Sequence, residues 1–430
     1  MKRVSFGVLF ALFFVFIATF PKGIWADEVV QFAWGGYPDV WTTIPLIFRS
    51  VGERMNHGQT CVQMILNYLT LRAFGASYFA LRFPSFVAYT LSLLAGERAL
   101  ARLGVRAPLR VLFLFGLGFS QINLEQGWEA RPYILLQASV MGTLWAWLRY
   151  AAGARRGLLV LALVAGVGIL FHPFYPAYAG LLVPGFLVVS REQRAFARRE
   201  IAARWPRLGA VVAGLLLLFA GIAKVSWMHS IHKRFGMDPY EWVGHDRSLA
   251  RFMLGTFFHP VGRGAVPLLL VLGAWVAWRR REVPRLAAAA LVLSVVVAVT
   301  QAIITRSVIH SEYWILQRQW VAGNALAWCV AMLLLEAGWR LARVPDRWDR
   351  RMFAVATCAG VVFLAVRIGG NLRREFPPIV PLEQSEALLA QRSAQKEITP
   401  SQFQDLAHQN LLRHGPVWPV FQRYYGFDSQ

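Results

Sequence analysis

The sequence predicts an all-α polytopic membrane protein with about eleven transmembrane helices, periplasmic juxtamembrane helices and a short polar C-terminal tail. Composition is the first observation: of 430 residues, 57% are hydrophobic and 16% are charged, against about 25% charged in a typical soluble domain. The apolar residues form runs that approach the length of about 20 residues needed to cross a bilayer. The arginines gather in alternate connections between those runs, which is typical of membrane topology.

The helices follow from the apolar runs, each bounded by charged or turn-forming residues. We expect membrane helices at about 5–24, 81–100, 108–124, 132–149, 157–172, 173–190, 208–228, 264–279, 286–305, 316–338 and 352–369. This division predicts a transmembrane domain over 1–370, in which residues 25–80 form a first outer loop with surface helices. A polar periplasmic segment follows over 371–430.

Charge orients these helices. With Lys2 and Arg3 in the cytoplasm, the cytoplasmic connections become "RALARLGVRAPLR", "RYAAGARR", "REQRAFARREIAARWPR", "RRREVPR" and "RLARVPDRWDRR". The outer connections are poorer in Lys and Arg, so the positive-inside pattern is consistent and predicts a bacterial inner membrane protein. The pattern requires residues 57–76 not to cross. That stretch carries Gln59, Gln63, Asn67 and Arg72, and we interpret it as an amphipathic helix on the outer surface.

Two adjacent carboxylates, Asp27 and Glu28, follow the first apolar run. The run could be a signal peptide, but it is long for one and small residues do not occupy both cleavage positions before Asp27. In either case the pair emerges on the periplasmic face. Most histidines share that face: His57, His172, His229, His232, His245, His259 and His310. Any one of these polar residues could simply be a solvated loop residue. Their grouping on one face instead favours an active site whose side-chain pKa values are adjusted for acid–base catalysis.

Several phrases resemble a known enzyme family. The Asp27-Glu28 pair is followed by "FGASYFALRFPS", and later by "EARPYILL" and "YWILQRQWVAGNALAW". In their order along the chain and in the side of the membrane on which they lie, these phrases resemble those of the C-type membrane glycosyltransferases that depend on polyprenol-phosphate sugars. Examples are protein O-mannosyltransferases and lipid A aminoarabinose transferases. The similarity covers roughly residues 5 to 340. The chain departs from it at "NHGQTCVQ", where the prolines common in relatives are absent, and this leaves the acceptor class open.

The resemblance implies transfer of a sugar from a polyprenyl-phosphate donor to a lipid, glycan or protein acceptor on the periplasmic face, by an inverting displacement. It assigns the catalytic carboxylate to Asp27. For Glu28 three interpretations stay open: it orients the acceptor, it helps to bind a metal, or it is a solvated residue with no role in the reaction. The resemblance and the outer position together make His57, Tyr133, His232 and Tyr313 candidates for binding substrate or acceptor.

The chemistry also needs cations that hold the phosphate as it takes up the leaving charge. Arg131, Lys233, Arg234 and Arg318 are the candidates, because guanidinium binds phosphate in a bidentate way. Arg131 is equally well interpreted as an interfacial arginine that reaches to the headgroups. His57, His232 and His245 could share a divalent ion with a carboxylate, but no pair has a diagnostic ligand spacing, so the metal is left open.

Two other functions compete. A transporter or flippase for polyprenyl-linked glycans would bind near mid-membrane between broken helices of inverted repeats, and no internal repeat is visible. A non-catalytic partner is compatible with the departures near His57. A nucleic-acid partner is disfavoured despite the net charge of +22, because the basic residues lie in short blocks between apolar runs.

Overall fold

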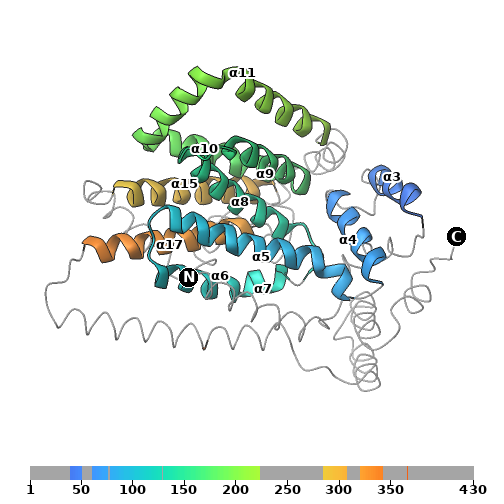
Figure 1. The fold of residues 1–430 in the computed structure, drawn as a ribbon. Helices are drawn as coiled ribbons and strands as arrows, with labels where there is room; N and C mark the ends of the chain where they lie inside the picture. Colours follow the sequence, from blue (N-terminus) through green and yellow to red (C-terminus); the bar gives the residue numbers. More distant parts are fainter. Residues whose placement is uncertain are drawn as a thin grey trace, which may run out of the picture.

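The computed structural model describes residues 39–50, 61–75, 78–127, 129–222, 284–307, 320–341 and 366, and these residues contain helices and no strand. Figure 1 shows the helices stacked in layers, from α11 down to α6 and α7. Their bounds are α3 Val40–Ser50, α4 Cys61–Phe74, α5 Tyr78–Arg102, α6 Ala107–Gly118, α7 Gln121–Gly127, α8 Tyr133–Ala151, α9 Gly157–Phe171, α10 Tyr175–Val189, α11 Arg191–Ile222, α15 Pro284–Ser307 and α17 Val321–Leu341.

Most of the predicted helices in the described ranges are present, with two differences of extent. The run expected at 108–124 divides into α6 and α7 at Ser120, whose hydroxyl donates to Leu117 O at 2.9 Å. The helix expected from 208 is the second of two helices that α11 joins across a kink at Arg204, and the arginine-rich connection before the kink is itself helical. Expected helices 5–24 and 264–279, and 352–369 apart from Val366, lie outside the described residues.

Four helices of the described part are long and apolar enough to cross a membrane: Phe79–Arg102, Arg191–Ile222, Pro284–Gln301 and Val321–Arg340. Ala107–Gly118, Gly157–Phe171 and Tyr175–Val189 are apolar but shorter. The total of eleven spans, the periplasmic position of the surface helices and the division at residue 370 stay predictions.

The predicted surface helix corresponds to α4, but two of its polar residues, Gln63 and Asn67, face the protein interior and not the outer surface. Gln63 and Asn67 are fully buried, and Gln63 Nε2 donates to Asn67 Oδ1 at 2.8 Å. The exposed face instead carries Leu69, Arg72 and Phe74. The pairing removes much of the cost of burying two amides, so this polar stripe belongs to the interface of α4 with its neighbours α3 and α5.

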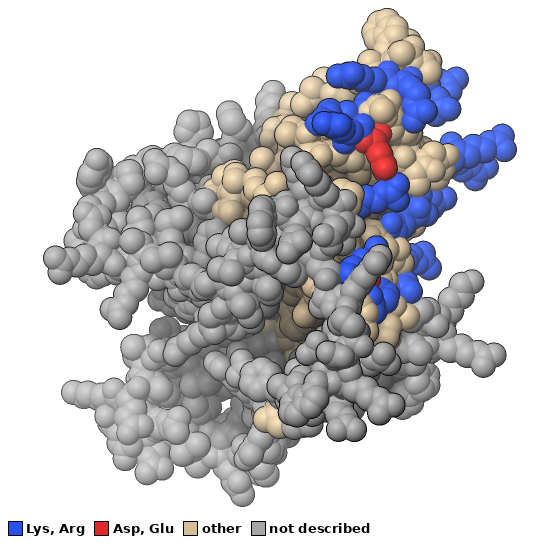
Figure 2. All heavy atoms as spheres, turned by 90° about the vertical axis from the view of Figure 1, so that its left-hand side faces the viewer, with Lys and Arg blue, Asp and Glu red and all other residues tan. Residues whose placement is uncertain are grey.

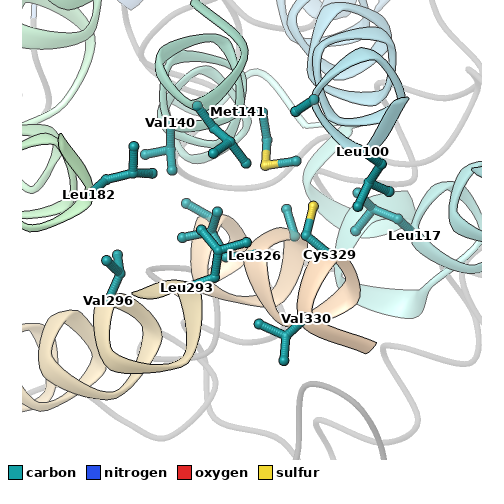
Figure 3. Close-up of a cluster of buried hydrophobic side chains, with 14 of the residues drawn as sticks. Leu100, Leu117, Val140, Met141, Leu182, Leu293, Val296, Leu326, Cys329 and Val330 are labelled. Carbon is teal, nitrogen blue, oxygen red and sulfur yellow. The ribbon is translucent and has the colours of Figure 1, made fainter. Parts of the chain in front are cut away.

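The core lies where α5, α6, α8, α10, α15 and α17 meet. Figure 3 shows its side chains converging from these helices, among them Leu100, Leu117, Met141, Leu293 and Cys329. Glycines allow the closest approaches. A Cβ at Gly96 would lie 2.5 Å from the Phe113 ring, and one at Gly116 would lie 2.4 Å from the Trp328 ring. Small residues at helix contacts are the usual means of close packing in membrane bundles.

Ion pairs fasten one end of the bundle. Glu336 in α17 accepts from Arg106 and from Arg340, each at 2.8 Å, and Glu97 in α5 accepts from Arg110 at 2.7 Å. Figure 2 shows Lys and Arg side chains spread over this face of the described residues, with few acidic ones among them. The connections after α5, α8 and α10 lie at this end. The connections α6–α7, α7–α8 and α9–α10 therefore lie at the opposite end.

Candidate functional site

The connection from α7 to α8, at the end opposite the arginine-rich face, carries a compact group of buried polar side chains. The Arg131 N–H donates to Glu129 O at 2.8 Å, and Gln126 Nε2 lies 3.5 Å from Glu129 Oε2. Pro132 follows at the N-cap of α8, where a proline costs no helical hydrogen bond. Sequence thus forces a tight turn here, and the turn directs the Arg131 side chain inward, where the residue is 6% exposed.

Arg131 and Tyr133, both predicted site residues, lie together. Arg131 Nη2 donates to the Tyr133 hydroxyl at 3.4 Å, and the guanidinium carbon is 5.5 Å from the centre of the tyrosine ring. Tyr133 is itself buried in the first turn of α8. A cation over an aromatic ring is attracted by the electrons of the ring face. The pair therefore holds a positive charge in a defined place at the edge of the bundle.

His172, in the turn between α9 and α10, adds a neutral ring to this group. Its ring centre is 5.8 Å from that of Tyr133, and its Nδ1 accepts from the Phe174 N–H at 3.1 Å. Burial lowers the pKa of His172 to about 3. The imidazole is therefore neutral at pH 7, so no second cation lies against the Tyr133 ring that Arg131 contacts.

Contacts between α5 and α8 bring a second buried arginine to the same end. Gln137 Nε2 donates to Ser92 Oγ at 2.9 Å, and this contact fixes the two helices in register. Both helices start at the site end, so Arg82 and Ser85 in α5 extend beyond Ser92 toward the connection that carries Arg131. Arg82 and Ser85 are fully buried. The family resemblance includes both residues in the phrase at the start of this helix.

A further polar group, which sequence reasoning missed, joins α6, α7 and α17. Ser120 Oγ accepts from Asn123 Nδ2 at 2.8 Å and lies 3.5 Å from Asn324 Nδ2. All three lie at the site end of the bundle, and the two asparagines are fully buried. The sequence did contain an indication of this group. Asn324 lies inside the apolar run of α17, and a buried asparagine requires a hydrogen-bond partner within the protein. The group ties the site connection to α17.

The remaining predicted residues cannot be placed relative to this group. Asp27, Glu28, His57, His232, Lys233, Arg234, Tyr313 and Arg318 lie outside the described residues. The same holds for His245, the third histidine considered as a metal ligand. Among the residues that the structure describes, no three His, Cys, Asp or Glu side chains gather in a way that could hold a metal ion.

Comparison with known proteins gives one structural likeness. No protein-family model and no curated protein matches the chain. Among solved structures, the chain is similar to ArnT from Cupriavidus metallidurans, crystallised with undecaprenyl phosphate. The two share 14% sequence identity, the match covers 99% of this chain and 74% of that chain, and the TM-score is 0.49. The function is therefore argued from the residues themselves.

Proposed function

We propose that this chain is an integral membrane glycosyltransferase. It moves a sugar from a polyprenyl-phosphate donor to a lipid, glycan or protein acceptor, at the membrane face opposite the arginine-rich end. In a bacterial inner membrane this is the periplasmic face. The observation that carries the proposal is the buried Arg131 guanidinium beside Tyr133, at the end of the bundle where the donor phosphate would lie.

A guanidinium in a low-dielectric environment interacts with an anion more strongly than it does in water. A lipid-linked sugar phosphate brings an anion to the membrane surface, since its polyprenyl chain stays in the bilayer. Arg131 can bind two phosphate oxygens at once. The Tyr133 hydroxyl oxygen accepts from Arg131, so its own proton is left to donate to a phosphate oxygen. The burial of Arg131 and its contact with Tyr133 therefore favour a role in phosphate binding over that of an interfacial arginine whose side chain reaches to the headgroups.

The reaction would proceed in one displacement. Asp27 accepts the proton of the acceptor hydroxyl while that oxygen bonds to the anomeric carbon and the bond from this carbon to the phosphate oxygen breaks. The leaving polyprenyl phosphate gains one negative charge, which Arg131, Lys233, Arg234 and Arg318 stabilise. Glu28 orients the acceptor. His57, His232 and Tyr313 bind the sugar or the acceptor in this proposal.

The test is sugar transfer by the purified full chain in liposomes that contain a polyprenyl-phosphate sugar donor and an extract of cell-envelope acceptors. Release of polyprenyl phosphate together with a glycosylated acceptor is the expected result. Arg131→Ala should weaken donor binding, whereas Arg98→Ala should not, because Arg98 is exposed and lies near the arginine-rich end of α5. Movement of the donor between leaflets without bond cleavage would overturn the proposal in favour of a flippase.

A further inference from the structure

The first half of α11 is attached to the bundle along a single stripe. Gln193 Oε1 accepts from Trp147 Nε1 at 2.6 Å, the Phe196 ring packs edge-on against Tyr150 at 4.9 Å, and Glu200 accepts from the Tyr150 hydroxyl at 2.7 Å. Residues with this spacing share one helix face. The stripe therefore fixes which side of the helix faces α8 and which side faces outward.

The outward side of this segment is strongly basic. Its exposed arginines are Arg191, Arg198 and Arg199. The two acidic residues of α11 are already engaged, Glu192 with Arg285 at 2.9 Å and Glu200 with Arg204 at 3.2 Å. No carboxylate in the described residues pairs with Arg198 or Arg199. Figure 2 shows the basic side chains at this end of the molecule. A surface that carries positive charges without neighbouring carboxylates attracts a negatively charged partner.

The second half of α11 changes character after a bend. Arg204 has φ −140° and ψ 21°, outside helical values, and Pro206 follows; Figure 1 shows α11 bent there. Beyond the bend, Val212, Leu216 and Leu217 are exposed, Leu217 to 75%, and no residue of α11 is buried. Apolar side chains this exposed in a candidate membrane span require acyl chains around them. Trp205, 67% exposed at the bend, is the residue type that favours the headgroup level.

We propose that the face of α11 carrying Arg191, Arg198 and Arg199 binds the headgroups of anionic phospholipids. The helix enters the bilayer directly after the bend, so its basic half is held at headgroup depth. Guanidinium groups bind phosphate in a bidentate way, and each basic side chain near an anionic surface adds to the attraction. The inference requires membrane insertion and does not depend on the glycosyltransferase proposal.

The basic face of α11 runs directly into its exposed apolar half, and this indicates that the ligand is a membrane lipid. A protein or nucleic-acid partner would need this face to stand clear of the membrane, whereas Ile201 and Trp205 are exposed beside the arginines and lead into the apolar half. An amphipathic segment with arginines and an exposed tryptophan is typical of helices that lie in the interface. Lipid headgroups therefore fit the mixture of charge and apolar surface.

The test measures binding of phosphatidylglycerol to the purified full chain in detergent by native mass spectrometry. Arg198→Gln combined with Arg199→Gln should weaken binding by about 25-fold, at about fivefold for each charge removed. The matched control combines Arg98→Gln with Arg102→Gln, which removes two exposed charges from the same end of the bundle. Equal losses in both double variants, or no loss in the first, would overturn the proposal.

One conservative variant and three changes of binding conditions test the proposal further. Arg198→Lys combined with Arg199→Lys keeps the charge but loses the bidentate contact, so it should bind the lipid more tightly than the glutamine variant and less tightly than the wild type. Equal binding by the lysine and glutamine variants would contradict the proposal. Binding should weaken as salt rises, because exposed charges are screened. Phosphatidylcholine should not be retained preferentially, and inorganic phosphate at low millimolar concentration should not displace the lipid. Retention of both lipids to the same extent would contradict a site for anionic headgroups.

Discussion

Arg106 and Glu336 form a two-point ion pair between the start of α6 and the end of α17. Arg106 Nε lies 2.8 Å from Glu336 Oε2, Nη2 lies 3.2 Å from Oε1, and the Arg106 backbone N–H donates to Oε2 at 3.1 Å. The Glu336 side chain is 2% exposed, and its Oε1 also accepts from Arg340 at 2.8 Å. One buried carboxylate thus fastens the arginine-rich end of the bundle, away from the site group.

Glu336→Gln should destabilise the folded protein by about 1.5–3 kcal/mol, because hydrogen bonds to charged groups are worth about that much and the glutamine cannot accept all of them. Thermal unfolding in detergent measures the loss. Glu192→Gln is the control, since its pair with Arg285 is exposed on both sides and exposed pairs contribute under about 1 kcal/mol. Equal changes for the two variants would show that burial does not determine the strength of these pairs.

Arg131 and Tyr133 should differ in their effect on the donor. Arg131→Ala should weaken binding of a polyprenyl-phosphate sugar by about 2–5 kcal/mol, as for other buried charge partners. Tyr133→Phe keeps the ring under the guanidinium and removes the hydroxyl, so a smaller loss of about 1 kcal/mol is expected. Equilibrium binding of a labelled donor in nanodiscs gives both values. Unchanged affinity in Arg131→Ala would remove this arginine from the phosphate site.

His172 should make stability depend on pH. Its pKa in the folded protein is about 3, below the unfolded value of 6.5, so the unfolded chain binds the proton more tightly between these values. This contribution to stability is complete above pH 6.5 and falls as the pH falls, by about 1.5–2 kcal/mol between pH 6.5 and 5.

The matched variant is His172→Asn, whose side-chain oxygen can still accept from the Phe174 N–H but does not titrate. Its unfolding midpoint should vary less with pH than that of the wild type over this interval. Parallel pH profiles for the two proteins would mean that His172 is accessible to protons in the folded state.

Asp27→Asn tests the proposed catalytic carboxylate. The substitution keeps size and hydrogen-bonding reach but removes basicity, so transfer should fall by about 10²–10⁴-fold while donor affinity changes little. Glu28→Gln should have a milder effect, because the proposed role of Glu28 is to orient the acceptor and not to remove its proton. Initial rates of transfer in liposomes compare the two. If Asp27 were only a solvated residue at a helix end, both variants would transfer at nearly the wild-type rate.

Cysteine labelling tests the predicted orientation, on a background from which the native cysteines are removed. Single cysteines at Gly36 and Asp238 should react with an impermeant thiol reagent in intact cells. A cysteine at Arg199, which is exposed in α11, should react only after permeabilisation. Labelling at Arg199 in intact cells would invert the topology and place the Arg131 group on the cytoplasmic side.

Sequence by itself determined most of the helices in the part of the chain that the structure describes. Apolar runs and the charges that bound them are local, so α8, α9, α10 and α15 lie close to the expected positions. The pairing of Arg131 with Tyr133 was also within reach, because two residues that flank Pro132 at a helix start are neighbours whatever the rest of the chain does.

Only the tertiary structure decided which polar residues meet across the bundle. Arg106 and Glu336 are 230 positions apart, and nothing in either local run indicates the other. The burial of Gln63 and Asn67 likewise depends on which face of α4 its neighbours cover. Helical periodicity gives the faces of a helix but not their partners, because in a bundle surrounded by lipid both apolar and polar stripes can face the protein.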